Sequence, residues 1–100
     1  MDIIELRDKI DAIDDEIIRL FCGRMRVSAD IAQYKAQRGL PVFDPERERS
    51  KLDDVLSKTD SDLRVYMGSL YERIFELSRE HQKALIGMNG STAQNVECKM

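Results

Sequence analysis

The sequence predicts an all-α protein with three helices per chain, one of them very long. Apolar residues alternate at spacings of four and three along two segments, as they do on one face of an α-helix. No segment shows the apolar–polar alternation of a strand. The 100 residues allow one small domain. We assign residues 1–86 to this helical domain and residues 87–100 to a flexible C-terminal tail, because the tail has no periodicity.

The first helix is expected between residues 2 and 38, where Gly23 is the only glycine and no proline occurs. Its apolar stripe consists of Leu6, Ile10, Ile13, Ile17, Leu20, Val27, Ile31 and Tyr34. Arg24 occupies the only slot of this stripe that is not apolar. A helix of about 35 residues is roughly 50 Å long, too long for a compact monomer of this size. We therefore expect the stripe to pack against a second copy of the chain.

The second helix follows a short loop. The segment RGLP at residues 38–41 ends the first helix, because glycine suits the position after a helix C-terminus and proline cannot continue the hydrogen-bond ladder. Asp44 is a good N-cap, and a proline follows it in the first helical position of a helix that runs to about residue 58. The apolar face consists of Leu52, Val55 and Leu56. Glu48 lies one turn before Leu52, so its carboxylate is expected to point inward.

The third helix is expected after a turn at residues 59–62. One stripe consists of Met67, Leu70, Ile74, Leu77, His81 and Ala84. A second stripe beside it consists of Tyr71, Phe75, Ser78, Gln82 and Leu85. Ser78 and Gln82 therefore interrupt a wide apolar arc one turn apart.

Composition and charge argue against several classes of function. Lys and Arg number 16 and Asp and Glu 19, so the net charge is −3 and the chain is not expected to bind nucleic acid or a membrane surface. No apolar run approaches the roughly 20 residues of a bilayer span, and the start lacks a signal-peptide pattern. We expect a cytoplasmic protein. Cys22 and Cys98 lack metal-ligand spacing and His81 is the only histidine, so no metal site is predicted.

Polar residues on the apolar faces are the candidates for function. Lys35 follows Arg24 by eleven residues, which places it about 20° around the helix and about 16 Å along its axis. The two cations therefore share a face and can hold a small anionic molecule, and Glu48, Ser78 and Gln82 can close the same cavity. One inward carboxylate cannot neutralise two inward cations, but a dianionic ligand would offset the imbalance.

Each of these residues also has a purely structural interpretation. Long side chains such as Arg24 can run along the helix edge into solvent. Glu48 can pair with Arg47 or Lys51, and Ser78 can bond back to a helix carbonyl. Only the convergence of these residues on one cavity favours a functional interpretation.

Arg7 lies seventeen residues before Arg24, which is about 25 Å along a straight helix and roughly 100° around it. One small molecule cannot contact both side chains from the same chain. In an antiparallel dimer, Arg7 of one chain can reach the cavity of the other. The structural alternative is a surface arginine paired with Asp11.

The chain resembles the all-helical (AroQ-type) chorismate mutases in two strings, LRDKIDAIDDEIIRLFCGRMRVSADIAQYKAQRGLPVFDPERE and SLYERIFELSREHQ, within residues 3–85. The combination of an LRxxIDxID opening, a central arginine, a lysine eleven residues later, a DPERE helix start and an SxxxQ pair carries the resemblance. It implies an intertwined homodimer and an isomerase that converts chorismate to prephenate. This reaction belongs to the shikimate-pathway branch of aromatic amino acid biosynthesis, towards phenylalanine and tyrosine, and needs no cofactor.

Carried over by position, the resemblance implies two identical sites. Each contains Arg24, Lys35, Asp44, Arg47, Glu48, Ser78 and Gln82 of one chain and Arg7 of the other. Both Arg24 and Arg7 would bind carboxylates of the substrate. Lys35 would bind a carboxylate and also donate to the ether oxygen, and Gln82 would donate to the ether oxygen. Glu48, with the backbone near Asp44, would accept the ring hydroxyl. Arg47 and Ser78 would orient the substrate, so the catalytic set is Lys35, Gln82, Arg24 and Glu48.

Two other functions remain as alternatives. An isochorismate-pyruvate lyase shares the fold and the cationic clamp, but there we expect an apolar residue at the position of Glu48. A non-catalytic module for helical dimerisation or ligand sensing would keep the apolar stripes. It would not need Arg24, Lys35, Glu48 and Gln82 to face one cavity, so binding of a dicarboxylate mimic of the transition state separates the two.

Overall fold

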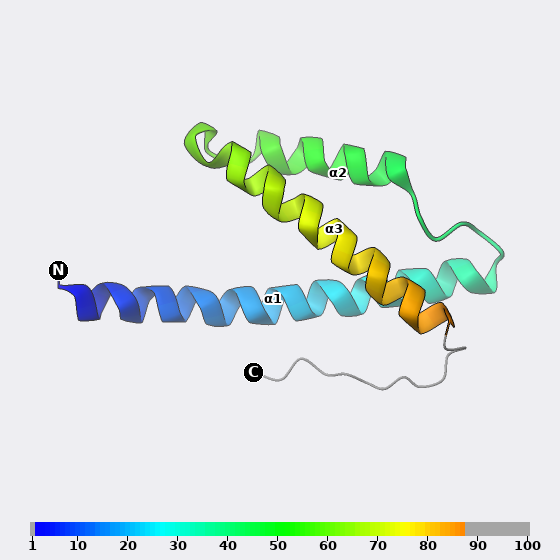
Figure 1. Cartoon of the computed structure of the whole chain (residues 1–100), viewed down its shortest axis with the longest axis horizontal. Coiled ribbons are helices and arrows are strands. Elements are labelled where there is room, and N and C mark those ends of the chain that lie inside the picture. The colour runs from blue at the N-terminus through cyan, green and yellow to red at the C-terminus, as the bar shows by residue number, and fades with distance from the viewer. Residues whose placement is uncertain (1, 88–100) are drawn as a thin grey trace.

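The computed structural model describes residues 2–87, and over these residues the fold is all-helical (Figure 1). The elements in chain order are α1 (Ile3–Gln37), α2 (Pro45–Ser57), the 3-10 turn η1 (Ser61–Leu63) and α3 (Arg64–Gly87). The prediction of three helices, one of them very long, is confirmed. Gly87 is the last residue of α3, and the rest of the predicted tail, residues 88–100, lies outside the described residues.

Local signals in the sequence explain both ends of α1. At its start, the Asp2 side chain accepts a hydrogen bond from the Glu5 backbone N–H. In return, the Glu5 side chain accepts a hydrogen bond from the Asp2 backbone N–H. This reciprocal capping box satisfies backbone donors that the first turn leaves open. At the other end Gly39 adopts a φ of +68°, and the Leu40 N–H donates to the Lys35 carbonyl. Glycine reaches this left-handed conformation without steric cost, which ends the helix after 35 residues.

The start of α2 also follows its prediction. The Asp44 side chain accepts a hydrogen bond from the Arg47 backbone N–H, and proline occupies the first helical position. At the turn before α3, the Arg64 guanidinium donates to the carbonyls of Leu56 and Thr59 at 2.9 Å each. The predicted turn is therefore ordered, and it reverses the chain so that α3 runs back along α2.

The three helices form an open, flat arrangement. Figure 1 shows α3 lying beside α2 and crossing the C-terminal half of α1, and α3 contacts both of the other helices. The chain measures 54 × 30 × 14 Å. Along the shortest dimension the chain is at most two helices thick, at the place where α3 crosses α1. The buried apolar residues of the described part are only Cys22, Ala32 and Phe75.

The apolar stripe of α1 is exposed in the single chain. The N-terminal half of α1 extends beyond the point where α3 crosses the helix (Figure 1). Four stripe residues there are more than half exposed: Ile10 (56%), Ile13 (56%), Ile17 (57%) and Leu20 (59%). A contiguous exposed row of large aliphatic side chains marks an interaction surface. Within residues 2–87, no helix is long and apolar enough to cross a membrane.

Candidate functional site

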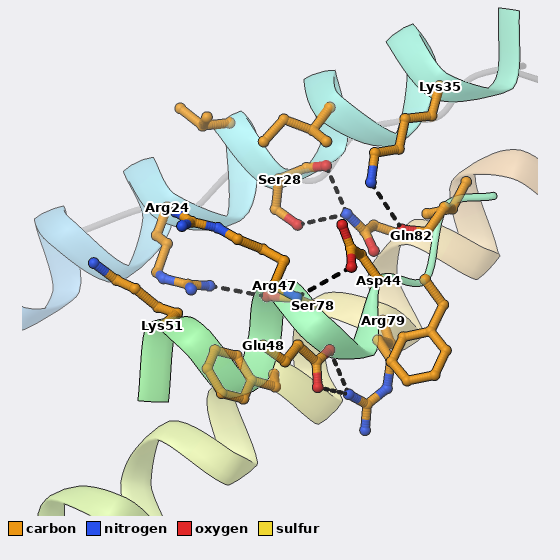
Figure 2. Close-up of a pocket in the computed structure, with 15 residues that line it drawn as sticks. Arg24, Ser28, Lys35, Asp44, Arg47, Glu48, Lys51, Ser78, Arg79 and Gln82 are labelled. Atoms are coloured by element: carbon orange, nitrogen blue, oxygen red, sulfur yellow. Dashed lines mark hydrogen bonds and ion pairs between the residues drawn. The ribbon is translucent and has the colours of Figure 1, made fainter. Parts of the chain in front are cut away.

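A pocket of about 300 Å³ opens where α1, α2, α3 and the loop 38–44 meet (Figure 2). It lies at the C-terminal half of α1, the N-terminal half of α2 and the C-terminal half of α3. Its lining consists of Arg24, Val27, Ser28, Ile31, Lys35, Val42, Phe43, Asp44, Arg47, Glu48, Lys51, Phe75, Ser78, Arg79 and Gln82.

The pocket brings together seven of the eight residues that the sequence singled out. These are Arg24, Lys35, Asp44, Arg47, Glu48, Ser78 and Gln82. Arg7 is exposed on the second turn of α1 and does not line the pocket of its own chain. The geometric expectation that one chain cannot bring Arg7 and Arg24 to the same small molecule is therefore met.

Arg24 does not extend along the helix edge into solvent. Its Nη1 donates to the Ser78 Oγ at 3.3 Å, and Ser78 is buried. The guanidinium carbon lies 5.8 Å from the ring centroid of Tyr71 and 5.7 Å from that of Phe75. Aromatic faces attract a guanidinium electrostatically at such distances. Two rings and a hydroxyl from α3 therefore fix this cation at the pocket.

Gln82 and Lys35 lie at the other end of the pocket (Figure 2). The Gln82 Nε2 donates to the backbone carbonyl and to the Oγ of Ser28, both at 2.8 Å, so the amide is anchored to α1. The Lys35 Nζ is 3.5 Å from the Val42 carbonyl, which is the outer limit of a hydrogen bond. The ammonium is therefore held only weakly and remains available for a ligand.

Glu48 points inward as predicted, but its partner is neither Arg47 nor Lys51. Both carboxylate oxygens lie 2.6 Å from Nη1 of Arg79 on α3. The side chains of the pair are 25% (Glu48) and 33% (Arg79) exposed. The sequence reasoning missed Arg79, although it lies one helical turn after Phe75 and three residues before Gln82, on the arc that faces the pocket.

Lys51 and Ser28 are two further lining residues that the sequence reasoning did not select. The Lys51 Nζ lies 3.3 Å from the Asp54 carboxylate, which Lys58 approaches to 3.0 Å. Hydrogen bonds from Lys58 and then Lys51 hold the pKa of Asp54 below its usual value. Lys51 comes one turn after Arg47 and Ser28 one turn after Arg24, so helical spacing from predicted residues was the signal that pointed to both.

The lining is strongly cationic. Its basic residues are Arg24, Lys35, Arg47, Lys51 and Arg79, and its acidic residues are Asp44 and Glu48. Five positive and two negative formal charges leave an excess of three positive charges, on a chain whose net charge is −3. Such a local excess attracts a small ligand with more than one negative charge. Within residues 2–87, no group of three or more His, Cys, Asp or Glu side chains is arranged to hold a metal ion.

Comparisons with known proteins agree on one family. The family model described as chorismate mutase type II matches residues 6–83. The chorismate mutase of Methanocaldococcus jannaschii is 35% identical over 86 residues, which cover 81% of this chain and 80% of that protein. The bifunctional chorismate mutase/prephenate dehydratase of Enterobacter agglomerans is 34% identical over 89 residues, 87% of this chain but only 23% of that protein. No solved structure gives a significant match.

Proposed function

The chain belongs to the type II chorismate mutase family, and we infer that it rearranges chorismate to prephenate in the pocket of Figure 2. The observation that carries the assignment to this pocket is the convergence of three helices on a cavity with three excess positive charges. Chorismate carries two carboxylates, so its charge complements this lining. The cavity of about 300 Å³ is at the lower end of the range for small-molecule sites.

The chemistry requires positioning rather than a nucleophile or a proton shuttle. In chorismate, a carbon–oxygen bond breaks while a carbon–carbon bond forms, within one molecule and through a chair-like transition state. Two effects accelerate such a step. The enzyme can hold the flexible enolpyruvyl arm in its reactive conformation, and it can place fixed donors where negative charge grows on the ether oxygen.

The lining residues offer groups for both effects. In our proposal Arg24, already oriented by Ser78 and two aromatic rings, binds one substrate carboxylate. Lys35 contacts a carboxylate and the ether oxygen. Gln82 donates a hydrogen bond to the ether oxygen. When the substrate binds, this bond replaces one of the two hydrogen bonds from Gln82 to Ser28. Glu48 accepts the ring hydroxyl.

The remaining proposed roles belong to three other side chains. Arg47 and Ser78 orient the substrate and its immediate ligands. Asp44 caps α2 through the Arg47 backbone N–H, which holds the first turn of α2 and its Glu48 against the pocket.

We also propose that the active unit is an intertwined homodimer in which Arg7 of the partner subunit completes each site. The flat shape and the exposed stripe of α1 support this, because both leave apolar surface that a second copy can cover. The antiparallel pairing of two α1 helices would carry Arg7 towards the pocket of the other chain.

A charge placed in the stripe is expected to separate the dimer. Ile13→Glu puts a carboxylate among the exposed aliphatic residues that the partner would cover, where an unpaired charge is costly to desolvate. Sedimentation equilibrium should show the mass of one 11.6 kDa chain for this variant and of two chains for the unchanged protein. Ala12→Glu, which adds the same charge outside the stripe, should remain dimeric. A dimeric Ile13→Glu variant would contradict the proposed interface.

The activity itself is tested by following the loss of chorismate absorbance at neutral pH and converting the product with acid to phenylpyruvate. Turnover by the unchanged protein is expected, with a loss of about 100-fold or more in Arg24→Ala. Arg26→Ala, an exposed arginine two residues further on, is the matched control and should retain activity. Failure to consume chorismate, or release of pyruvate and salicylate from isochorismate instead, would overturn the assignment.

A further inference from the structure

Arg79 links three separate parts of the pocket. It projects from α3, contacts both oxygens of Glu48 on α2, and its guanidinium carbon lies 5.1 Å from the ring centroid of Phe43 in the loop 38–44. Figure 2 shows Arg79 on the side of Glu48 away from Arg24 and Lys51. The arginine therefore holds the carboxylate from one side.

The Glu48 carboxylate needs such a restraint because other cations surround it. Lys51 lies three residues further along α2, and both Arg47 and Arg24 line the same cavity. A glutamate side chain has three rotatable bonds, and each of these cations offers it another orientation. Contact with Arg79 at 2.6 Å favours one of them.

The Glu48 carboxylate can accept further hydrogen bonds while it contacts Arg79. Two carboxylate oxygens provide about four lone-pair sites, so Glu48 can accept from the guanidinium and from a substrate hydroxyl together. The positive charge of Arg79 also offsets the negative charge that Glu48 would otherwise present to a dianionic substrate. Both effects favour binding of the hydroxyl at a carboxylate that is already in place.

We propose that Arg79 is a positioning residue, which orients the Glu48 carboxylate to accept the ring hydroxyl of the substrate and ties it to the loop 38–44 through Phe43. The proposal rests on the proposed function, in which Glu48 is the hydroxyl acceptor. It assigns to Arg79 no contact with the reacting atoms. The positioning effect is therefore confined to ligands that carry the hydroxyl.

This restriction to hydroxyl-bearing ligands supplies the test. Two bicyclic dicarboxylate mimics of the transition state, identical except that one lacks the hydroxyl, are titrated into Arg79→Ala by calorimetry. Affinity for the hydroxyl-bearing mimic is expected to fall by about 10- to 100-fold. Affinity for the mimic without the hydroxyl should fall by a clearly smaller factor, because that mimic loses only the positive charge of Arg79. The kcat/KM for chorismate should fall by a factor similar to the loss of affinity for the hydroxyl-bearing mimic.

The matched control is Arg73→Ala, which removes an arginine from the exposed face of the same helix, where it pairs with Glu76. Both affinities and kcat/KM should stay unchanged in this variant. A second arm combines Arg79→Ala with Glu48→Gln. In this background the arginine substitution should lower both affinities by the same factor, because the group that it positions is already altered.

The outcomes separate failure of this proposal from failure of the proposed function. Equal losses for both mimics in Arg79→Ala would mean that the arginine acts only through its charge or through the fold, and would overturn the proposal. A weakened Glu48→Gln beside an unaffected Arg79→Ala would also overturn it while leaving Glu48 as the hydroxyl acceptor. An unaffected Glu48→Gln would instead remove the role of Glu48 on which the proposal rests.

Discussion

Lys35→Ala is expected to lower kcat by about 10²- to 10³-fold, which corresponds to about 3 to 4 kcal/mol of transition-state stabilisation. The proposed reason is that its ammonium faces the ether oxygen as negative charge develops there. Little stability should be lost, because the only hydrogen bond that the structure shows for the Lys35 ammonium is the long one to the Val42 carbonyl. Steady-state kinetics with chorismate and thermal unfolding followed by circular dichroism measure the two effects separately.

Lys58→Ala is the control, since Lys58 is exposed and pairs with Asp54 outside the pocket. It should retain full activity. A loss comparable to that of Lys35→Ala is expected for Gln82→Ala, the second proposed donor to the ether oxygen. Near-normal turnover in Lys35→Ala, or a loss of activity matched by unfolding, would contradict the role given to the ammonium.

Activity is expected to return when the chains of two inactive variants, Arg7→Ala and Lys35→Ala, are combined in one dimer. If Arg7 acts in the site of the partner subunit, one site of the mixed dimer lacks both side chains and the other is intact. Co-expression with two different affinity tags isolates this heterodimer. Its kcat per dimer should reach about half that of the unchanged protein.

The matched control combines Lys35→Ala with Gln82→Ala. Because Lys35 and Gln82 line the same pocket of one chain, each site of this heterodimer lacks one of them, and no activity should return. The absence of recovery in the Arg7→Ala and Lys35→Ala pair would show that the two residues do not meet across the chains. Full activity of Arg7→Ala alone would remove Arg7 from the site.

Most of the helical structure was predictable because its causes are local. The start of α1 depends on Asp2 and Glu5, its end on Gly39, and the start of α2 on Asp44. Each of these residues acts within one turn of its own helix, so sequence spacing alone reveals it. The length of α1 followed from the same signals.

The site was predictable as far as each residue marks a break in an apolar pattern. A charge such as Arg24 in the stripe of α1, or an amide such as Gln82 in that of α3, is conspicuous because burial of an unpaired polar group is costly. Periodicity thus indicated which face each side chain shares. Arg7 differs, since its proposed role depends on a second chain, and within one chain the structure leaves it exposed.

The sequence by itself determined the three helices, their ends and the inward direction of Arg24, Lys35, Glu48, Ser78 and Gln82. Only the tertiary structure decided which side chains meet between helices, above all that Glu48 pairs with Arg79, thirty-one residues away, rather than with a neighbour on α2. The physical reason is that periodicity specifies a direction around one helix axis. Contacts between helices depend also on where two axes cross, and packing over the whole chain sets that crossing.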